Sequence, residues 1–351
     1  MKAPRSATFL SDVRRFALRR AAFPVSTAAM LFAAVAQASA SFGLPLDCRP
    51  GATCWIANYV DLDSGARAAD YRCGPLTYDG HTGTDFAIRD LGVLREGVAV
   101  RAAASGTVQS TRDGEPDRRV RDAGAGSVDG RECGNGVRID HGGGLVTQYC
   151  HLRKGSVGVR RGDRVEAGQQ VGLVGLSGET EFPHVHFAVF HDGAAVDPFS
   201  GRTAAQGCGA ASGSGSGSLW DPAAQQALPY ARRQVYNLGL AGEVPQVERV
   251  RSGEYARARV GGDAPVLAMW MEAFGVAKGD RVRLEIVGPD GRSVVRSDEA
   301  VEKDFARVFR WAGKRRGKDP WPPGSYRLSA EILAADGAEP SRAMAVVEVK
   351  G

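Results

Sequence analysis

Short apolar runs that alternate with glycine-containing turns fill residues 97–190 and predict β-strands. The expected strands lie at 97–102, 106–109, 137–140, 145–149 and 184–190. Runs of this length, ended by turn residues, are typical of strands. The pattern contains no long amphipathic helix. We therefore expect a mainly β chain whose first domain is an antiparallel β-sheet.

A glycine- and serine-rich tract at 209–218 predicts a flexible linker. Beyond it we expect a helix within 219–236 and strands at 266–271, 281–287, 306–311, 326–333 and 343–349. Turn sequences separate these strands at intervals typical of a sandwich. The prediction is a small immunoglobulin-like β-sandwich over 219–351. Its Trp270, Trp311 and Trp321 form either an aromatic binding surface or part of the core.

A charged stretch at 111–131 has little apolar content and predicts a long surface loop between two strands. Long loops often have functional roles. Such a loop either covers a cleft and contacts substrate, or is an idle insertion. The residues leave both alternatives open.

The first 40 residues have the pattern of a secretory signal peptide. Arginine pairs at 14–15 and 19–20 precede an apolar stretch at 21–35, and Ala38-Ser39-Ala40 is a small-residue cleavage site. The apolar stretch is too short to span a bilayer. We expect an exported protein, periplasmic or extracellular, that begins near Ser41 and has no transmembrane segment after cleavage.

Charge and composition identify no partner but argue against nucleic acid. The 45 Lys and Arg residues against 40 Asp and Glu give a formal net charge of +5, spread along the chain. Nucleic-acid binding needs a concentrated basic patch. Attraction to an acidic envelope polymer and ordinary surface charge explain the composition equally well. We expect a monomer.

All six histidines lie between residues 81 and 191, and two short runs place them at ligand-like spacing. In His184-Val185-His186 the two imidazoles share one face of a predicted strand. His81 and Asp85 are four apart, and Gly83 between them permits close approach to an ion. Imidazole and carboxylate are typical zinc ligands. Three protein donors with a fourth position for water are typical of a catalytic zinc site.

Five blocks of sequence, in a fixed order, carry a resemblance to a known family. They read HTGTDFA at 81–87, GNGVRIDHG at 134–142, YCHL at 149–152, GDRVEAGQ at 162–169 and PHVHF at 183–187. Together they resemble the lysostaphin-like or LytM-type zinc peptidases, which cleave peptide cross-links of bacterial cell walls. The resemblance covers about residues 75–200 and implies the family's fold, a duplicated hybrid motif of antiparallel strands.

The resemblance implies roles for five residues. His81, Asp85 and His186 would bind one Zn²⁺ per chain, and His151 and His184 would be the paired catalytic histidines. The chain has no His-Glu-x-x-His helix to supply a glutamate base, so a histidine would take that role. We expect His151 to be the base and His184 to steady the oxyanion or the water, although the two roles are interchangeable at this point.

The two remaining histidines are not expected in the site. His141 lies in the run DHGGG at 140–144, a composition typical of a hairpin turn. His191 follows the last predicted strand of the first domain and is expected to be exposed.

Six cysteines in an exported chain predict disulfides. A thiolate zinc site is the alternative, but the chain has no Cys-x-x-Cys pair. Cys133 and Cys150 flank strands joined by the turn at 142–144, so their pairing is expected first, and it would fix the backbone that presents His151. Cys54 with Cys73 and Cys48 with Cys208 would complete the set.

The leading hypothesis is an exported zinc metalloendopeptidase that hydrolyses peptide bonds in peptidoglycan cross-links or stem peptides. One alternative is a non-catalytic peptidoglycan-binding or hydrolase-activating module. The other is a secreted protease for glycine-rich proteins. The expected layout is a signal peptide at 1–40, a disulfide-containing segment at 41–74, the peptidase domain at 75–208, the linker at 209–218 and the accessory sandwich at 219–351.

Overall fold

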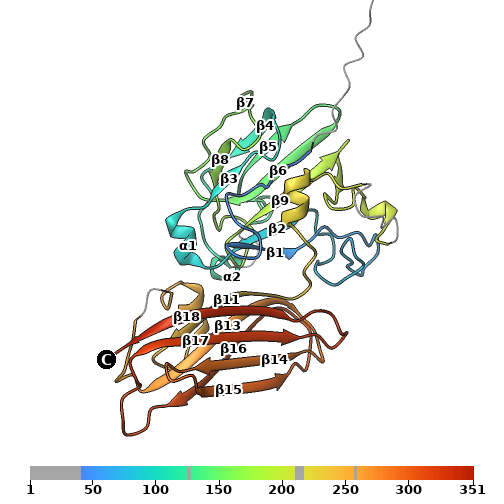
Figure 1. Ribbon diagram of the computed structural model, residues 1–351. Helices are drawn as coiled ribbons and strands as arrows, with labels where there is room; N and C mark the ends of the chain where they lie inside the picture. The colour runs from blue at the N-terminus through green and yellow to red at the C-terminus, as the bar shows by residue number, and fades with distance from the viewer. Residues whose placement is uncertain (1–40, 125–127, 210–216, 257–258) are drawn as a thin grey trace, which may run out of the picture. The chain divides into compact units, whose positions relative to one another are not determined.

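The computed structural model describes residues 41–124, 128–209, 217–256 and 259–351 (Figure 1). The predicted signal peptide and positions 210–216 of the predicted linker lie outside the described residues. No helix within the described ranges is long and apolar enough to cross a membrane.

The first sheet contains eight strands in the order β1-β2-β9-β6-β5-β4-β7, with β10 paired to β9, and every pairing is antiparallel. A smaller sheet pairs β3 with β8. The predicted antiparallel sheet is confirmed. The strands are β1 (Cys54–Asn58), β2 (Thr84–Ile88), β3 (Ala99–Arg101), β4 (Gly106–Arg112), β5 (Asn135–Asp140), β6 (Leu145–Leu152), β7 (Arg164–Val165), β8 (Gln170–Leu173), β9 (His184–His191) and β10 (Ala194–Val196).

Successive side chains of β9 point alternately toward the core and toward the other face of the sheet. Val185, Phe187 and Val189 are fully buried and belong to the main core of this region. His184 and His186 lie between them in sequence and therefore point to the opposite face. Three short helices accompany the sheet: α1 (Leu91–Glu96), α2 (Val120–Ala123) and the 3₁₀ helix η1 (Ala204–Gln206).

The second half of the chain forms two further sheets around one core. The order is β11-β13-β16 in one sheet and β12-β18-β17-β14-β15 in the other, and buried side chains of both form a single cluster. This arrangement is consistent with the predicted sandwich, which is called the sandwich below. Its elements are β11 (Gln234–Ala241), α4 (Val247–Arg251), β12 (Val260–Gly261), β13 (Val266–Val276), β14 (Arg281–Val287), β15 (Ser293–Ala300), β16 (Phe305–Arg315), β17 (Gly324–Leu333) and β18 (Ser341–Lys350).

The segment expected to hold one helix over 219–236 is divided. Helix α3 spans only Pro222–Ala227, with Asp221 as its N-cap, and Pro229 prevents its continuation. Trp220 and Leu228 belong to the core of the first sheet. The next element, β11, is a strand that the sequence reasoning missed. Strand β15 was also missed because most of its side chains are exposed and leave no apolar alternation.

The three tryptophans of the sandwich do not form a shared aromatic surface. Trp270 and Trp321 are buried, with 2% and 8% of their surface exposed, whereas Trp311 is 40% exposed. The indole Nε1 of Trp321 donates to the carbonyl oxygen of Ala264. Two of the three are therefore core residues.

All six cysteines are paired in three disulfides, and one of the three predicted pairings is correct. Cys133 pairs with Cys150 as predicted. The other two are Cys48 with Cys54 and Cys73 with Cys208, so the predicted pairs Cys54–Cys73 and Cys48–Cys208 are wrong. The chain turns back at Gly51, whose N–H donates to the carbonyl oxygen of Cys54. This turn leaves the Cα atoms of Cys48 and Cys54 only 5.9 Å apart.

Candidate metal centre and catalytic histidines

Side chains of His81, Asp85 and His186 meet on the face of the first sheet that is turned away from its core. Their potential ligand atoms all lie within 4.8 Å of one another. The Oδ1 atom of Asp85 is 3.1 Å from Nε2 of His81 and 3.0 Å from Nδ1 of His186. These two nitrogen atoms are 3.0 Å apart. The sequence placed these residues among its candidates, and the fold brings them together.

The register between β2 and β9 brings these side chains together. Asp85 and His186 are directly opposite each other in the antiparallel pair, which places their side chains on the same face. His81 precedes β2, and its Nδ1–H donates to the carbonyl oxygen of Tyr59 at 2.6 Å. The second carboxylate oxygen of Asp85 accepts a hydrogen bond from Nδ2 of Asn58 at 2.8 Å. His81 and Asp85 are therefore each oriented by a contact from outside the cluster.

Gly83 has a different role from the one expected. A Cβ atom at this position would lie 2.6 Å from Nε2 of His186 and 2.8 Å from the carbonyl oxygen of Phe187. The glycine therefore makes room for the imidazole of His186 rather than for an ion.

The donor set fits a divalent cation. A carbonyl oxygen can only accept, so Nδ1 of His81 carries the ring proton and Nε2 presents a lone pair. This lone pair, Nδ1 of His186 and the carboxylate of Asp85 all converge. Two imidazole nitrogens and one carboxylate oxygen are a donor set that suits Zn²⁺. Burial alone would raise the pKa of Asp85, but the charges of His81 and His184 and hydrogen bonds from the histidines hold it well below its usual value.

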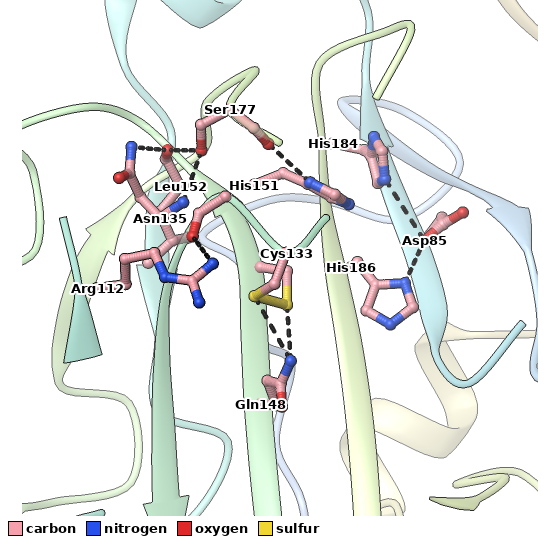
Figure 2. Close-up of a disulfide and its surroundings, with 12 residues drawn as sticks. Asp85, Arg112, Cys133, Asn135, Gln148, His151, Leu152, Ser177, His184 and His186 are labelled. Atoms are coloured by element: carbon pink, nitrogen blue, oxygen red, sulfur yellow. Dashed lines mark hydrogen bonds and ion pairs between the residues drawn. A yellow bond between two sulfur atoms is a disulfide. The ribbon is translucent and has the colours of Figure 1, made fainter. Parts of the chain in front are cut away.

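His151 and His184 stand next to this cluster with their ring centroids 4.6 Å apart (Figure 2). The Nδ1–H of His151 donates to the carbonyl oxygen of Ser177 at 2.8 Å. The Nδ1–H of His184 donates to the carbonyl oxygen of Phe182 at 2.9 Å and lies 3.1 Å from Oγ1 of Thr180. Both rings therefore keep the Nε2 lone pair available in the neutral state. Nε2 of His184 is 3.5 Å from Oδ1 of Asp85.

The backbone at His151 is held in an uncommon conformation. Its φ is +62°, a region that residues other than glycine rarely adopt. The N–H of His151 donates to the carbonyl oxygen of Cys133, the partner of Cys150 in the adjacent disulfide. Burial, followed by the charges of His184 and His186, holds the pKa of His151 well below its usual value. The imidazole is therefore neutral at neutral pH and able to accept a proton.

The charged stretch at 111–131 is tied to the segment that orients both histidines. Backbone N–H groups of Arg118 and Val120 donate to the carbonyl oxygens of Leu176 and Thr180. The N–H of Leu176 in turn donates to a carboxylate oxygen of Asp117. Positions 125–127 lie outside the described residues. Residues 117–120 of the insertion therefore lie beside the segment that contains Ser177 and Thr180.

Beyond the histidines, the same face of the sheet carries a guanidinium group. Arg138 on β5 pairs with Gln148 on β6, and Gln148 pairs with Ala188 on β9. Ala188 is two residues from His186 in the same strand, so all of these side chains share one face. The Cζ atom of Arg138 lies 5.1 Å from the ring centroid of Phe190. Its Nε is buried without a hydrogen-bond partner. Within the described part of the chain, the side chain of Arg138 forms no ion pair.

His141 and His191 lie apart from the cluster. The imidazole of His141 contacts the carbonyl oxygen of Ser105 and Oγ1 of Thr147, at 2.9 and 2.8 Å. The side chain of His191 is 57% exposed. Neither belongs to the group of potential metal ligands.

Sequence reasoning missed the residues that orient the candidate side chains. Tyr59, Ser177 and Phe182 act through backbone carbonyl oxygens, which any residue type supplies. Asn58 carries a polar side chain at the end of β1 but lies in no recognisable motif. Only the five candidate side chains themselves lie in recognisable motifs.

Residues 79–198 match peptidase family M23. The chain is 32% identical over 117 residues to the peptidoglycan DD-endopeptidase ShyA of Vibrio cholerae, which covers 33% of this chain and 22% of that protein. It is 31% identical over 134 residues to the DD-carboxypeptidase/endopeptidase Mpg of Neisseria meningitidis. This match covers 37% of this chain and 25% of Mpg. The solved catalytic domain of the M23 protein EnpA from Enterococcus faecalis is 28% identical to this chain. The match covers 40% of this chain and 95% of the EnpA domain, with a TM-score of 0.27. The chain thus spans about a quarter of the length of the two curated relatives.

Proposed function

Since the chain belongs to peptidase family M23 through residues 79–198, we propose that it is an exported zinc endopeptidase that cuts peptide bonds in peptidoglycan cross-links or stem peptides. One observation carries the proposal. Three donor atoms within 4.8 Å of one another stand beside two histidines whose Nε2 lone pairs are available. A non-catalytic relative would be expected to lack one of these five side chains.

The proposed mechanism follows from what each side chain offers. His81, Asp85 and His186 would hold Zn²⁺, which supplies Lewis acidity and lowers the pKa of water. His151 would take the proton from the attacking water at Nε2 and return it to the leaving amine. His184, whose Nδ1–H is bound to the carbonyl oxygen of Phe182, would accept a hydrogen bond from the attacking water at Nε2 and so hold it in position.

Export is supported by the three disulfides and by the pattern of residues 1–40. Disulfides persist in oxidising compartments and are rare in the cytosol. We place the activity in the periplasm or outside the cell, where the proposed wall substrate is also found.

Purified peptidoglycan tests the proposal directly. The mature protein should release soluble fragments with new amino termini, a chelator should stop the release, and added Zn²⁺ should restore it. Mass spectrometry of the fragments would identify the bond. A protein that contains one zinc per chain but releases nothing from walls or from a glycine-rich polypeptide would favour the non-catalytic alternative.

Arg138 favours an acidic peptide substrate over a glycine-rich protein. Its guanidinium lies on the face of the metal centre and forms no ion pair within the described residues. Stem peptides carry free carboxylates, and a guanidinium binds a carboxylate through charge-assisted hydrogen bonds. Polyglycine offers no such group within the chain.

Replacing Arg138 with glutamine should raise KM for a carboxylate-bearing stem peptide about 10-fold, in line with the loss of roughly 1.5 kcal/mol from one charged hydrogen bond. The kcat value should change little. Steady-state kinetics on this peptide and on pentaglycine would measure the difference. Arg160→Gln, at an exposed position, is the matched control for net charge. An equal effect on both peptides would contradict the assignment.

A further inference from the structure

Phe182 fixes the imidazole of His184 in two ways. Its carbonyl oxygen accepts the Nδ1–H of His184 at 2.9 Å, and Oγ1 of Thr180 donates to the same oxygen at 2.8 Å. Its ring also stacks on the imidazole, with centroids 4.6 Å apart and an interplanar angle of 29°. The orientation of His184 therefore depends on where Phe182 lies.

Side chains of the sandwich cover Phe182. The described residues from 41 onward belong to one compact unit, and within it Phe182 packs against a mixed cluster. The ring of Phe274, on β13, is 5.8 Å from that of Phe182. The Cζ atom of Arg307, on β16, lies 5.7 Å from the Phe182 centroid. The members of this cluster from both parts of the chain are Trp55, Ala57, Ala87, Tyr236 and Phe274.

A network of buried groups holds Arg307 over the ring. Its Nε donates to the hydroxyl oxygen of Tyr236 at 2.6 Å, and its Nη2 lies 3.2 Å from Oε1 of Glu272. Glu272 is fully buried and also accepts from Nε of Arg251 at 2.8 Å. Tyr236 stacks on Phe274 with centroids 4.3 Å apart. A buried carboxylate requires its partners in place, so this network gives Arg307 a fixed position.

A second contact from the sandwich reaches the same segment by another route. Nη1 of Arg119, in the insertion, lies 2.6 Å from Oε2 of Glu248 on α4. The next residue, Val120, donates its N–H to the carbonyl oxygen of Thr180. The segment that orients His184 is thus supported from two sides.

We propose that Phe274 and Arg307 are positioning residues for the reaction: they hold Phe182, and through it the His184 imidazole, beside the metal centre. The sandwich is then part of the catalytic unit and not only a tether or a wall-binding accessory. The inference rests on the proposed catalytic role of His184. A sandwich that served only as a spacer would have no need of an aromatic and guanidinium contact on the residue that anchors this histidine.

The test uses the full-length, zinc-loaded protein and a soluble stem peptide, so that wall targeting does not contribute. Phe274→Ala should lower kcat about 10-fold or more, because small displacements of a catalytic group cost this much, with KM and zinc content unchanged. Phe274→Leu, which restores most of the packing volume, should recover most of the rate. Arg307→Lys, which keeps the charge but loses the planar contact, should give a smaller loss of kcat. Trp311→Ala removes a half-exposed aromatic residue of the same sheet and should leave kcat unchanged.

A spectroscopic measurement separates failure of this inference from failure of the proposed function. Stacking on Phe182 shifts the ring protons of His184 upfield, and Phe274→Ala should move these NMR signals toward ordinary values while Trp311→Ala does not. Unchanged His184 signals together with wild-type kcat in folded Phe274→Ala protein would overturn the inference. If the wild-type protein hydrolyses neither walls nor peptides, the proposed function fails, and the NMR signals still decide whether the sandwich positions His184.

Discussion

The His151→Ala protein is expected to keep one zinc per chain and to lose kcat by about 10²- to 10⁴-fold, the contribution of a positioned general base. His151 is not among the three converging donors, so the metal centre remains intact. Its Nε2 can accept the proton, because its Nδ1–H is bound to the carbonyl oxygen of Ser177. Steady-state kinetics on a soluble peptide and metal analysis of the same sample measure both quantities.

Two further variants serve as controls for this result. Asp85→Ala should lose both zinc and activity, because it removes the donor that contacts His81 and His186. His191→Ala removes an exposed imidazole and should change neither. A His151→Ala protein that keeps its zinc and has wild-type kcat would exclude His151 as the base.

The alternation of side chains between the two faces of a strand could be predicted from the sequence, but the pairing between strands could not. The run from His184 to Phe190 predicted both the strand and the shared face of its two histidines, since valine and phenylalanine occupy the intervening positions. The neighbour of His186 is Asp85, which lies about a hundred residues earlier in the chain. Nothing in the local pattern specifies that register. The spacing of the histidines indicated a metal site, and the motif resemblance indicated which three residues would meet in it.

The residues that orient the two proposed catalytic histidines had no sequence signal. Ser177 and Phe182 contribute main-chain oxygens, and their side-chain identity does not reveal this. The sandwich was expected to be an accessory domain, and it contains no histidine or cysteine. Metal ligands and catalytic bases can be sought by residue type. A packing contact such as that of Arg307 with Phe182 cannot be predicted in this way.

Errors in the cysteine pairing have a related cause. Cys133 and Cys150 were assigned correctly because a single hairpin joins them. The other pairs depend on a turn at residues 49–54 and on the approach of Cys208 to Cys73 across a sequence separation of 135. Neither is encoded in strand periodicity.

Two of the disulfides can be removed in separate variants. The variant that loses more stability is expected to keep its kcat, and the variant that loses less stability is expected to lose activity. In the chain-entropy description, a longer closed loop gives more stabilisation. The Cys73–Cys208 bond closes a separation of 135 and the Cys133–Cys150 bond one of 17. The paired serine variants should therefore lose about 5 and about 3 kcal/mol of unfolding free energy, respectively.

Catalysis should show the reverse order, because only the shorter bridge contacts the proposed base. Cys150 precedes His151, and the carbonyl oxygen of Cys133 accepts the N–H of His151 at 2.8 Å. The Cys133→Ser, Cys150→Ser protein should thus lose about 10-fold in kcat through displacement of this histidine, while the Cys73→Ser, Cys208→Ser protein keeps wild-type kcat well below its melting temperature. Denaturant unfolding and peptide kinetics on the same preparations give both orders. If kcat follows stability in both variants, the bridge at Cys133 acts only on the fold, and His151 is held by Ser177 and its backbone neighbours alone.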